Sequence, residues 1–142
     1  MLPWRCHYLV RSFYMERLPY IDEHAITLDA DTATTWSAVL TTLCGDAADP
    51  RAPFGFAIAD FEPGQRLSLR GRHVFAVYEW VFILDASGPR QTRLRSQTWA
   101  AFPGPHGKVY RALVIGTGGH RVVVRRTLKR IAGRARQEQK IS

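Results

Sequence analysis

The residue best suited to chemistry in this sequence of 142 residues is His120, which follows Gly116 and Gly119 on the apolar side of a predicted helix. A histidine in that position can bind a ligand carbonyl or act as a general acid or base. It can equally be structural, with its ring hydrogen-bonded to a strand side chain such as Tyr78 or Thr98. The catalytic hypothesis takes His120 as the acid/base and Tyr78 as an orienting donor.

The glycines before His120 weaken the predicted helix. Three glycines within residues 116–119 cost about 2–3 kcal/mol of helix propensity relative to alanine. Close approach of the helix to a sheet, room for a ligand, or a kink would each explain them. They do not form a GxGxxG motif, and Gly104–Lys108 lacks the Ser or Thr of a P-loop, so neither segment indicates a nucleotide site.

Two long alternating segments predict the opposite wall of a site. In Val74–Asp85 the even positions are apolar or aromatic, and in Gln91–Phe102 the inward set is small and partly polar. Small inward residues that face large ones leave room for a cavity, or simply accommodate bulky neighbours. An apolar wall with few polar groups is typical of a small-molecule site. The predicted ligand contacts are His24, Tyr78, Trp80, Phe82, Ser96, Thr98, Leu113, Gly116, Gly119 and His120.

Other catalytic or metal-binding patterns are missing from the sequence. The histidines His24, His73, His106 and His120 do not have metal-ligand spacing, such as two histidines four apart on a helix. No carboxylate pair and no compelling Ser/His/Asp or Cys/His order occurs. We therefore expect no metal and no cofactor, and the sequence leaves open whether the protein is an enzyme.

The remaining periodicities predict an α+β fold. Asp31 is a candidate N-cap for the next helix, Gly45 ends that helix, and Glu62–Gln65 has the composition of a turn. The predicted strands before the long pair are Tyr20–Ala30, Phe54–Phe61 and Arg66–Gly71, and the predicted first helix is Thr32–Leu43. A curved antiparallel sheet wrapped around the C-terminal helix would bury all these apolar faces in one domain.

The C-terminal segment predicts one long helix over Gly104–Gly133. Its start follows a Pro-Gly-Pro break and Gly133 is a natural stop. We divide the chain into a weakly ordered extension (1–19), with Met15 as an alternative start, a folded domain (20–133) and a basic tail (134–142).

Charge is concentrated at the C-terminal end. Residues 1–107 carry 10 basic and 11 acidic groups, whereas residues 108–142 carry ten basic groups and one acid. Solvation and the helix dipole explain such a face, as does peripheral contact with an anionic membrane. Nucleic acid is the less favoured partner, because no reading element or stacking aromatic accompanies the charges. With two distant cysteines and no signal-peptide or spanning segment, the expected location is the cytoplasm; the sequence sets no oligomeric state.

Several segments and the order of the elements carry a resemblance to a known family. The segments are His24-Ala25-Ile26-Thr27-Leu28, Asp31, Trp36-Ser37-Ala38-Val39-Leu40, Glu62-Pro63-Gly64-Gln65-Arg66-Leu67, Thr92-Arg93-Leu94 and the stretch from Tyr110 to Arg121. Over residues 20–133 the chain resembles the START-like, polyketide-cyclase (SRPBCC) superfamily with its helix-grip fold, and the stretch from Tyr110 to Arg121 resembles that of uncharacterised bacterial members. The resemblance implies a hydrophobic pocket between the sheet and the C-terminal helix that holds a small molecule or lipid; the alternative it implies is a cyclase/dehydratase-type enzyme.

Overall fold

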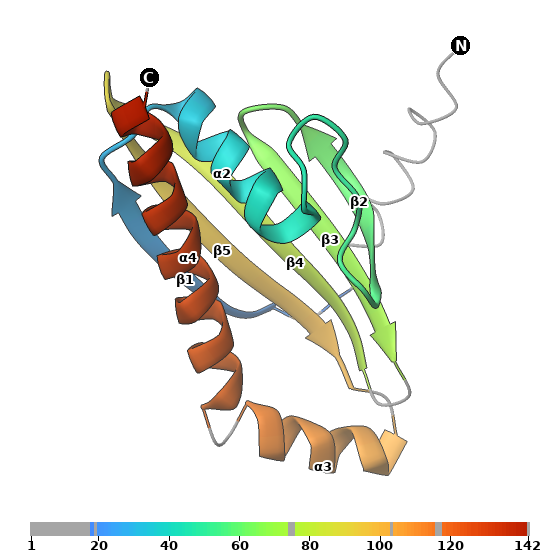
Figure 1. Ribbon diagram of the computed structural model, residues 1–142. Coiled ribbons are helices and arrows are strands. Elements are labelled where there is room, and N and C mark those ends of the chain that lie inside the picture. The colour runs from blue at the N-terminus through green and yellow to red at the C-terminus, as the bar shows by residue number, and fades with distance from the viewer. Residues whose placement is uncertain (1–17, 19, 74–75, 103, 116–117, 142) are drawn as a thin grey trace.

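The sheet and its helices follow the predicted α+β arrangement. A computed structural model describes residues 18, 20–73, 76–102, 104–115 and 118–141 (Figure 1). The predicted extension 1–19, except Leu18, and the site residue Gly116 therefore lie outside the described residues. The elements run β1 (Tyr20–Leu28), α2 (Thr32–Cys44), β2 (Phe56–Glu62), β3 (Arg66–His73), β4 (Ala76–Gly88), β5 (Gln91–Ala101), α3 (Gly104–Val114) and α4 (Gly119–Ile141).

The described strands form one antiparallel sheet in the order β1-β5-β4-β3-β2. Strands β2 to β5 follow one another as hairpins, and β1 joins the far edge by pairing with β5. Gly64 has a φ of 76° in the β2–β3 turn, as the Pro-Gly pattern predicts. The alternation of side chains then sends Leu67, Phe82 and Leu94 to the face that the helices cover, where each is fully buried.

Helices α2 and α4 pack against each other over this face of the sheet (Figure 1). Ala38, Val39 and Leu40 of α2 are buried, and Leu128 and Ile131 of α4 belong to the same core cluster. The apolar stripe of each helix thus meets the apolar face of the sheet. This is the helix-grip arrangement, and it confirms the predicted fold class.

The prediction of one continuous C-terminal helix is wrong. The segment forms α3 and α4, with a turn between them in which Gly118 has a φ of 81° and its amide donates to the Ile115 carbonyl at 3.2 Å. A left-handed φ stops an α-helix and suits glycine. Of the three explanations for the glycine cluster, the break is therefore the one observed.

The predicted stop at Gly133 is also wrong, because α4 continues to Ile141. Gly133 lies inside the helix, exposed, with open space around it. Ala135 in the next turn is fully buried, and Gln139 Oε1 accepts a hydrogen bond of 3.0 Å from the Asp31 amide. These contacts stabilise the last turns, so most of the predicted tail is helical. No helix among the described residues is both long and apolar enough to cross a membrane.

The face of the sheet away from the helices is not uniformly polar. Glu79 and Ser68, which alternation assigns to that face, are both fully buried. The Glu79 carboxylate accepts a hydrogen bond from the Ser68 hydroxyl and pairs with Arg70 at 3.4 Å. A buried carboxylate needs such partners. Glu79 is therefore held in a structural cluster away from the helix-covered face.

We expect Asp31→Ala to lower the free energy of unfolding by about 1 kcal/mol at neutral pH, because the Asp31 side chain caps α2 by accepting from the Thr34 amide at 2.7 Å. That hydrogen bond holds the pKa of Asp31 below its ordinary value of 3.8. The contribution is therefore complete above pH 3.8 and is lost as the pH falls through the lowered pKa. Urea unfolding of both proteins at neutral and acidic pH measures this. Asp29→Ala, an exposed change of equal charge, is the control; equal losses for the two variants would contradict a capping role.

Candidate functional site

A pocket of about 380 Å³ lies between the sheet and the helix break. Strands β2 to β5 form one wall, the segment before β2 forms the rim, and the first turns of α4 form the other wall. The break explains the position: because α4 begins only at Gly119, its first residues border the pocket together with Val114 of α3. The lining residues are Phe54, Gly55, Phe56, Arg72, Tyr78, Trp80, Thr98, Val114, Gly119, His120, Val123 and Val124.

Half of the ten predicted ligand contacts line this pocket. They are Tyr78, Trp80, Thr98, Gly119 and His120. Four others do not line it, namely His24, Phe82, Ser96 and Leu113, and Gly116 is outside the described residues. Leu113 points out from α3 with 62% of its surface exposed. Phe82 and Ser96 are fully buried, so they can act on the pocket only through the residues in front of them.

Aromatic side chains make up the sheet wall. The ring of Phe56 lies 6.3 Å from that of Tyr78 and 6.4 Å from that of Trp80. Trp80 is fixed from behind, since its indole N–H donates to the Ser96 hydroxyl at 2.7 Å and its ring packs 4.8 Å from Phe82. The indole is therefore satisfied within the protein and presents an apolar surface to the pocket.

Gly71 is the residue that lets Phe56 lie against the wall. It pairs with Phe56 across the β2–β3 ladder, and a Cβ at this position would come within 2.8 Å of the Phe56 ring. Phe56 lines the pocket but is not among the ligand contacts predicted from the sequence. The signal was a glycine inside a strand, which often marks close approach of another group.

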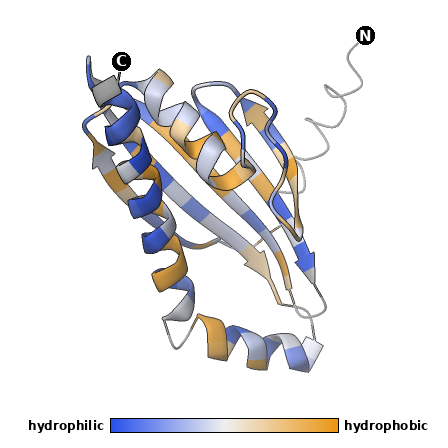
Figure 2. Cartoon of the chain, viewed as in Figure 1, coloured by the Kyte–Doolittle hydropathy of each residue, from blue (hydrophilic) through white to orange (hydrophobic). Residues whose placement is uncertain are grey.

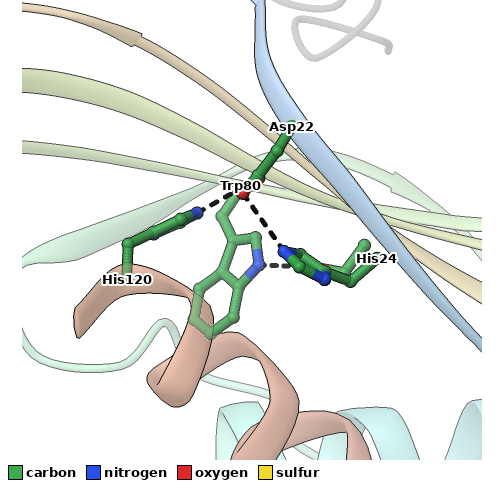
Figure 3. Close-up of polar contacts among 5 residues, drawn as sticks. Asp22, His24, Trp80 and His120 are labelled. Carbon is green, nitrogen blue, oxygen red and sulfur yellow. Dashed lines mark hydrogen bonds and ion pairs between the residues drawn. The ribbon is translucent and has the colours of Figure 1, made fainter. Parts of the chain in front are cut away.

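One carboxylate joins the two predicted site histidines. Asp22 Oδ1 lies 3.2 Å from His120 Nε2, and Asp22 Oδ2 lies 3.1 Å from His24 Nε2 (Figure 3). All three side chains are mostly buried. The predicted structural partners of His120, Tyr78 or Thr98, are thus replaced by Asp22. Strand alternation could have found it, because Asp22 stands two residues before His24 on the same face.

This arrangement leaves a defined chemical role for His120. A carboxylate accepts hydrogen bonds, so the contact places a proton on Nε2 of the ring. In the neutral imidazole Nδ1 is then the acceptor. A histidine oriented by a carboxylate and bordering a pocket is the geometry of a general base or of a hydrogen-bonding partner for a ligand.

Besides His120, the side chains of Arg72, Tyr78 and Thr98 bring polar atoms to the pocket. The Thr98 hydroxyl, opposite Asp22 in the β1–β5 ladder, is buried and has no hydrogen-bond partner among the described residues. The Tyr78 hydroxyl lies 3.2 Å from that of Tyr110, which tethers α3 to the sheet. Burial, and next the hydrogen bond to Tyr110, raise the pKa of Tyr78 well above its ordinary value, so this phenol stays neutral and able to donate.

Groups of side chains that could hold a metal ion were sought among the residues that the structure describes. The described residues hold no group of three or more His, Cys, Asp or Glu side chains arranged to bind a metal ion. The cluster of Asp22, His24 and His120 instead satisfies itself by hydrogen bonds.

The fold is similar to that of solved structures of START superfamily and aromatase/cyclase proteins. No protein-family model and no curated protein sequence matches the chain. Solved structures do match, with low identity. The Zhui aromatase/cyclase from Streptomyces sp. R1128 is 13% identical over 85% of this chain and 95% of that chain, with a TM-score of 0.60. A START superfamily protein from Mycobacterium smegmatis is 15% identical over 83% and 98% of the two chains, with a TM-score of 0.54.

A plant enzyme structure has the same fold. A point mutant of Thalictrum flavum norcoclaurine synthase, in complex with a transition state analogue, is 11% identical over 86% of this chain and 99% of that chain, with a TM-score of 0.57. At these identities the likeness establishes the START-like fold and leaves the activity to be argued from the site.

We expect Tyr110→Phe to lower the pKa of Tyr78 part of the way toward its ordinary value of 10.0, because the variant removes the Tyr110 hydroxyl but not the burial. An NMR titration of ring-labelled tyrosine measures this, with Tyr78→Phe to identify the resonance. A Tyr78 pKa that does not change when the Tyr110 hydroxyl is removed would contradict the contact.

Proposed function

We propose that this protein binds a hydrophobic small molecule or lipid in the pocket between the sheet and the first turns of α4. The observation that carries the proposal is the pocket itself, about 380 Å³ in volume with walls that are mainly aromatic and aliphatic. Pockets of this size and character are typical of small-molecule sites. The START-like fold of the neighbouring structures supports the same function.

The distribution of polar atoms supports a ligand that is apolar along its length and polar at one end. Trp80 and Tyr78 already have hydrogen-bond partners in Ser96 and Tyr110. A ligand therefore needs no polar atom against the middle of this wall. The Thr98 hydroxyl, the ring of His120 and the exposed side chain of Arg72 border the same pocket as polar groups. A ligand oxygen near them would satisfy the buried Thr98 hydroxyl.

Val123→Trp is expected to weaken ligand binding by about tenfold or more, because Val123 lines the pocket and is 57% exposed, so the larger ring can occupy the site without entering the core. Fluorescence titration with an anilinonaphthalene probe and with a fluorescent fatty acid measures the dissociation constants. Val122→Trp is the matched control, since Val122 is its 53% exposed neighbour and does not line the pocket.

Failure of the wild-type protein to bind either probe, together with ligand-free protein in native mass spectrometry after gentle purification, would overturn the proposal. Equal loss in the two tryptophan variants would show binding outside the pocket.

The second candidate function is acid/base catalysis of the cyclase or dehydratase type, with His120 as the acid/base. The specific observation that favours it is the His120–Asp22 contact of 3.2 Å at the pocket wall. Asp22 would orient the ring, and Tyr78, as a neutral phenol, would donate a hydrogen bond to a substrate carbonyl. Such an enzyme would remove a proton next to that carbonyl.

His120→Ala is expected to abolish catalysis while leaving the melting temperature nearly unchanged. The assay is hydrogen–deuterium exchange next to the carbonyl of 2-tetralone, an apolar aromatic ketone, followed by NMR. Under the enzyme hypothesis the wild-type protein accelerates exchange by about 100-fold or more, and Asp22→Asn loses most of that acceleration. His106→Gln, an exposed histidine on α3, is the control. The hypothesis would be contradicted if the wild-type protein did not accelerate exchange. It would also be contradicted if His120→Ala lowered the melting temperature along with the activity, because that result indicates a structural histidine.

The cytoplasmic location remains a prediction from the sequence.

A further inference from the structure

Exposed apolar side chains gather where α3 meets α4. Of the six large hydrophobic residues that the described part of the chain exposes, four belong to these two helices, and a fifth, Phe54, is fully exposed at the rim of the pocket. Figure 2 shows the hydrophobic bands on both sides of the turn, with hydrophilic residues along the rest of α4. We call this the corner surface; its residues are Val109 and Leu113 of α3, and Arg121, Val122, Val123 and Arg125 of α4.

The exposure of these residues is large. Val109 and Leu113, four residues apart on α3, are 61% and 62% exposed, and Val122 is 53% exposed. Spacing by four puts the first two on one face of their helix. Clustered apolar surface on a folded chain marks a contact with something that removes it from water.

The positive charges of the corner surface favour an anionic partner. Arg121 and Arg125 are exposed beside Val122 in the first turns of α4. No aspartate or glutamate occurs in the sequence between Asp85 and Glu138, so nothing acidic on α3 or most of α4 offsets them. A second copy of the chain, with a net charge of +8, would bring like charges together.

An anionic bilayer uses both kinds of residue at the corner surface. A nucleic acid would pair with the arginines but leave the valines and leucine in water. At an anionic bilayer the arginines meet the headgroups while the apolar side chains enter the boundary between headgroups and acyl chains. We infer that the corner surface docks this protein onto an anionic lipid bilayer.

Docking at this place has a geometric consequence for the pocket. Val123 belongs both to the corner surface and to the pocket lining, and Phe54 stands at the pocket rim. The bilayer would therefore face the mouth of the pocket. The inference goes beyond the proposed ligand function and does not require it, because docking uses residues outside the pocket as well.

The test is co-sedimentation of the full chain with vesicles of phosphatidylcholine, with and without about 30% phosphatidylserine. Binding is expected to require phosphatidylserine and to fall steeply between about 0.1 M and about 0.5 M salt. The double variant Arg121→Gln/Arg125→Gln should weaken binding by about tenfold or more. The matched control is Arg134→Gln/Arg136→Gln, which removes the same charge from exposed positions about 20 Å farther along α4 and should weaken binding much less.

The apolar part of the inference has its own variant. Val109→Ser/Val122→Ser keeps every charge and does not alter the pocket lining, so it should weaken vesicle binding while the anilinonaphthalene probe still binds. Melting temperatures show that the variants are folded. Three results would overturn the inference: no binding to phosphatidylserine vesicles, equal weakening by the two arginine pairs, or unchanged binding by the serine variant. Stronger binding to duplex DNA than to vesicles, or dimerisation at the corner surface in light scattering, would also overturn it. If Val123→Trp loses probe binding but still binds vesicles, membrane docking does not depend on an intact ligand site.

Discussion

The left-handed conformation of Gly118 is the constraint on which the rest of the site depends. It ends one helix and allows another to start in a new direction, so α4 can pack along α2 while α3 leaves the sheet. A continuous helix would have carried Val114 and His120 along one axis. With the turn, both residues border the same pocket, and Tyr110 holds α3 to Tyr78 on the sheet. The break between α3 and α4 thus produces a concave site that one continuous helix would not form.

The sheet could be predicted well from the sequence because its signals are local. Alternation assigned Leu67, Phe82 and Leu94 to the covered face, and Asp31 was recognisable as an N-cap by residue type and position. The ends of the C-terminal helices could not be predicted in the same way. The glycines were compatible with three outcomes of similar local energy. The helix continues past Gly133 because of tertiary contacts, such as Gln139 with Asp31, that no local pattern contains.

The candidate site was predicted in part for similar reasons. Residues that alternation points inward from β4 and β5, such as Tyr78 and Thr98, do line the pocket. Ser96 and Phe82 obey the same alternation yet support Trp80 from behind, a distinction that depends on side-chain packing. Asp22 was within reach of the alternation argument, but its joint contact with His24 and His120 depends on how α4 crosses β1. Spacing along the chain holds no information about that crossing.

The pairing of β1 with β5 has a consequence for synthesis of the chain. Glu23 lies opposite Gln97, and the Thr92 hydroxyl donates to the Ala30 carbonyl, so the first described strand must wait for the fifth. While the nascent chain leaves the ribosome, β2, β3 and β4 can assemble as successive hairpins, but β1 keeps an open hydrogen-bonding edge. Helix α4, which follows the other described elements in the chain, then covers the assembled sheet and bonds back to the start of α2. The domain therefore closes only after α4 has been synthesised, and the interval before closure is when its strand edges are most open to aggregation or to chaperones.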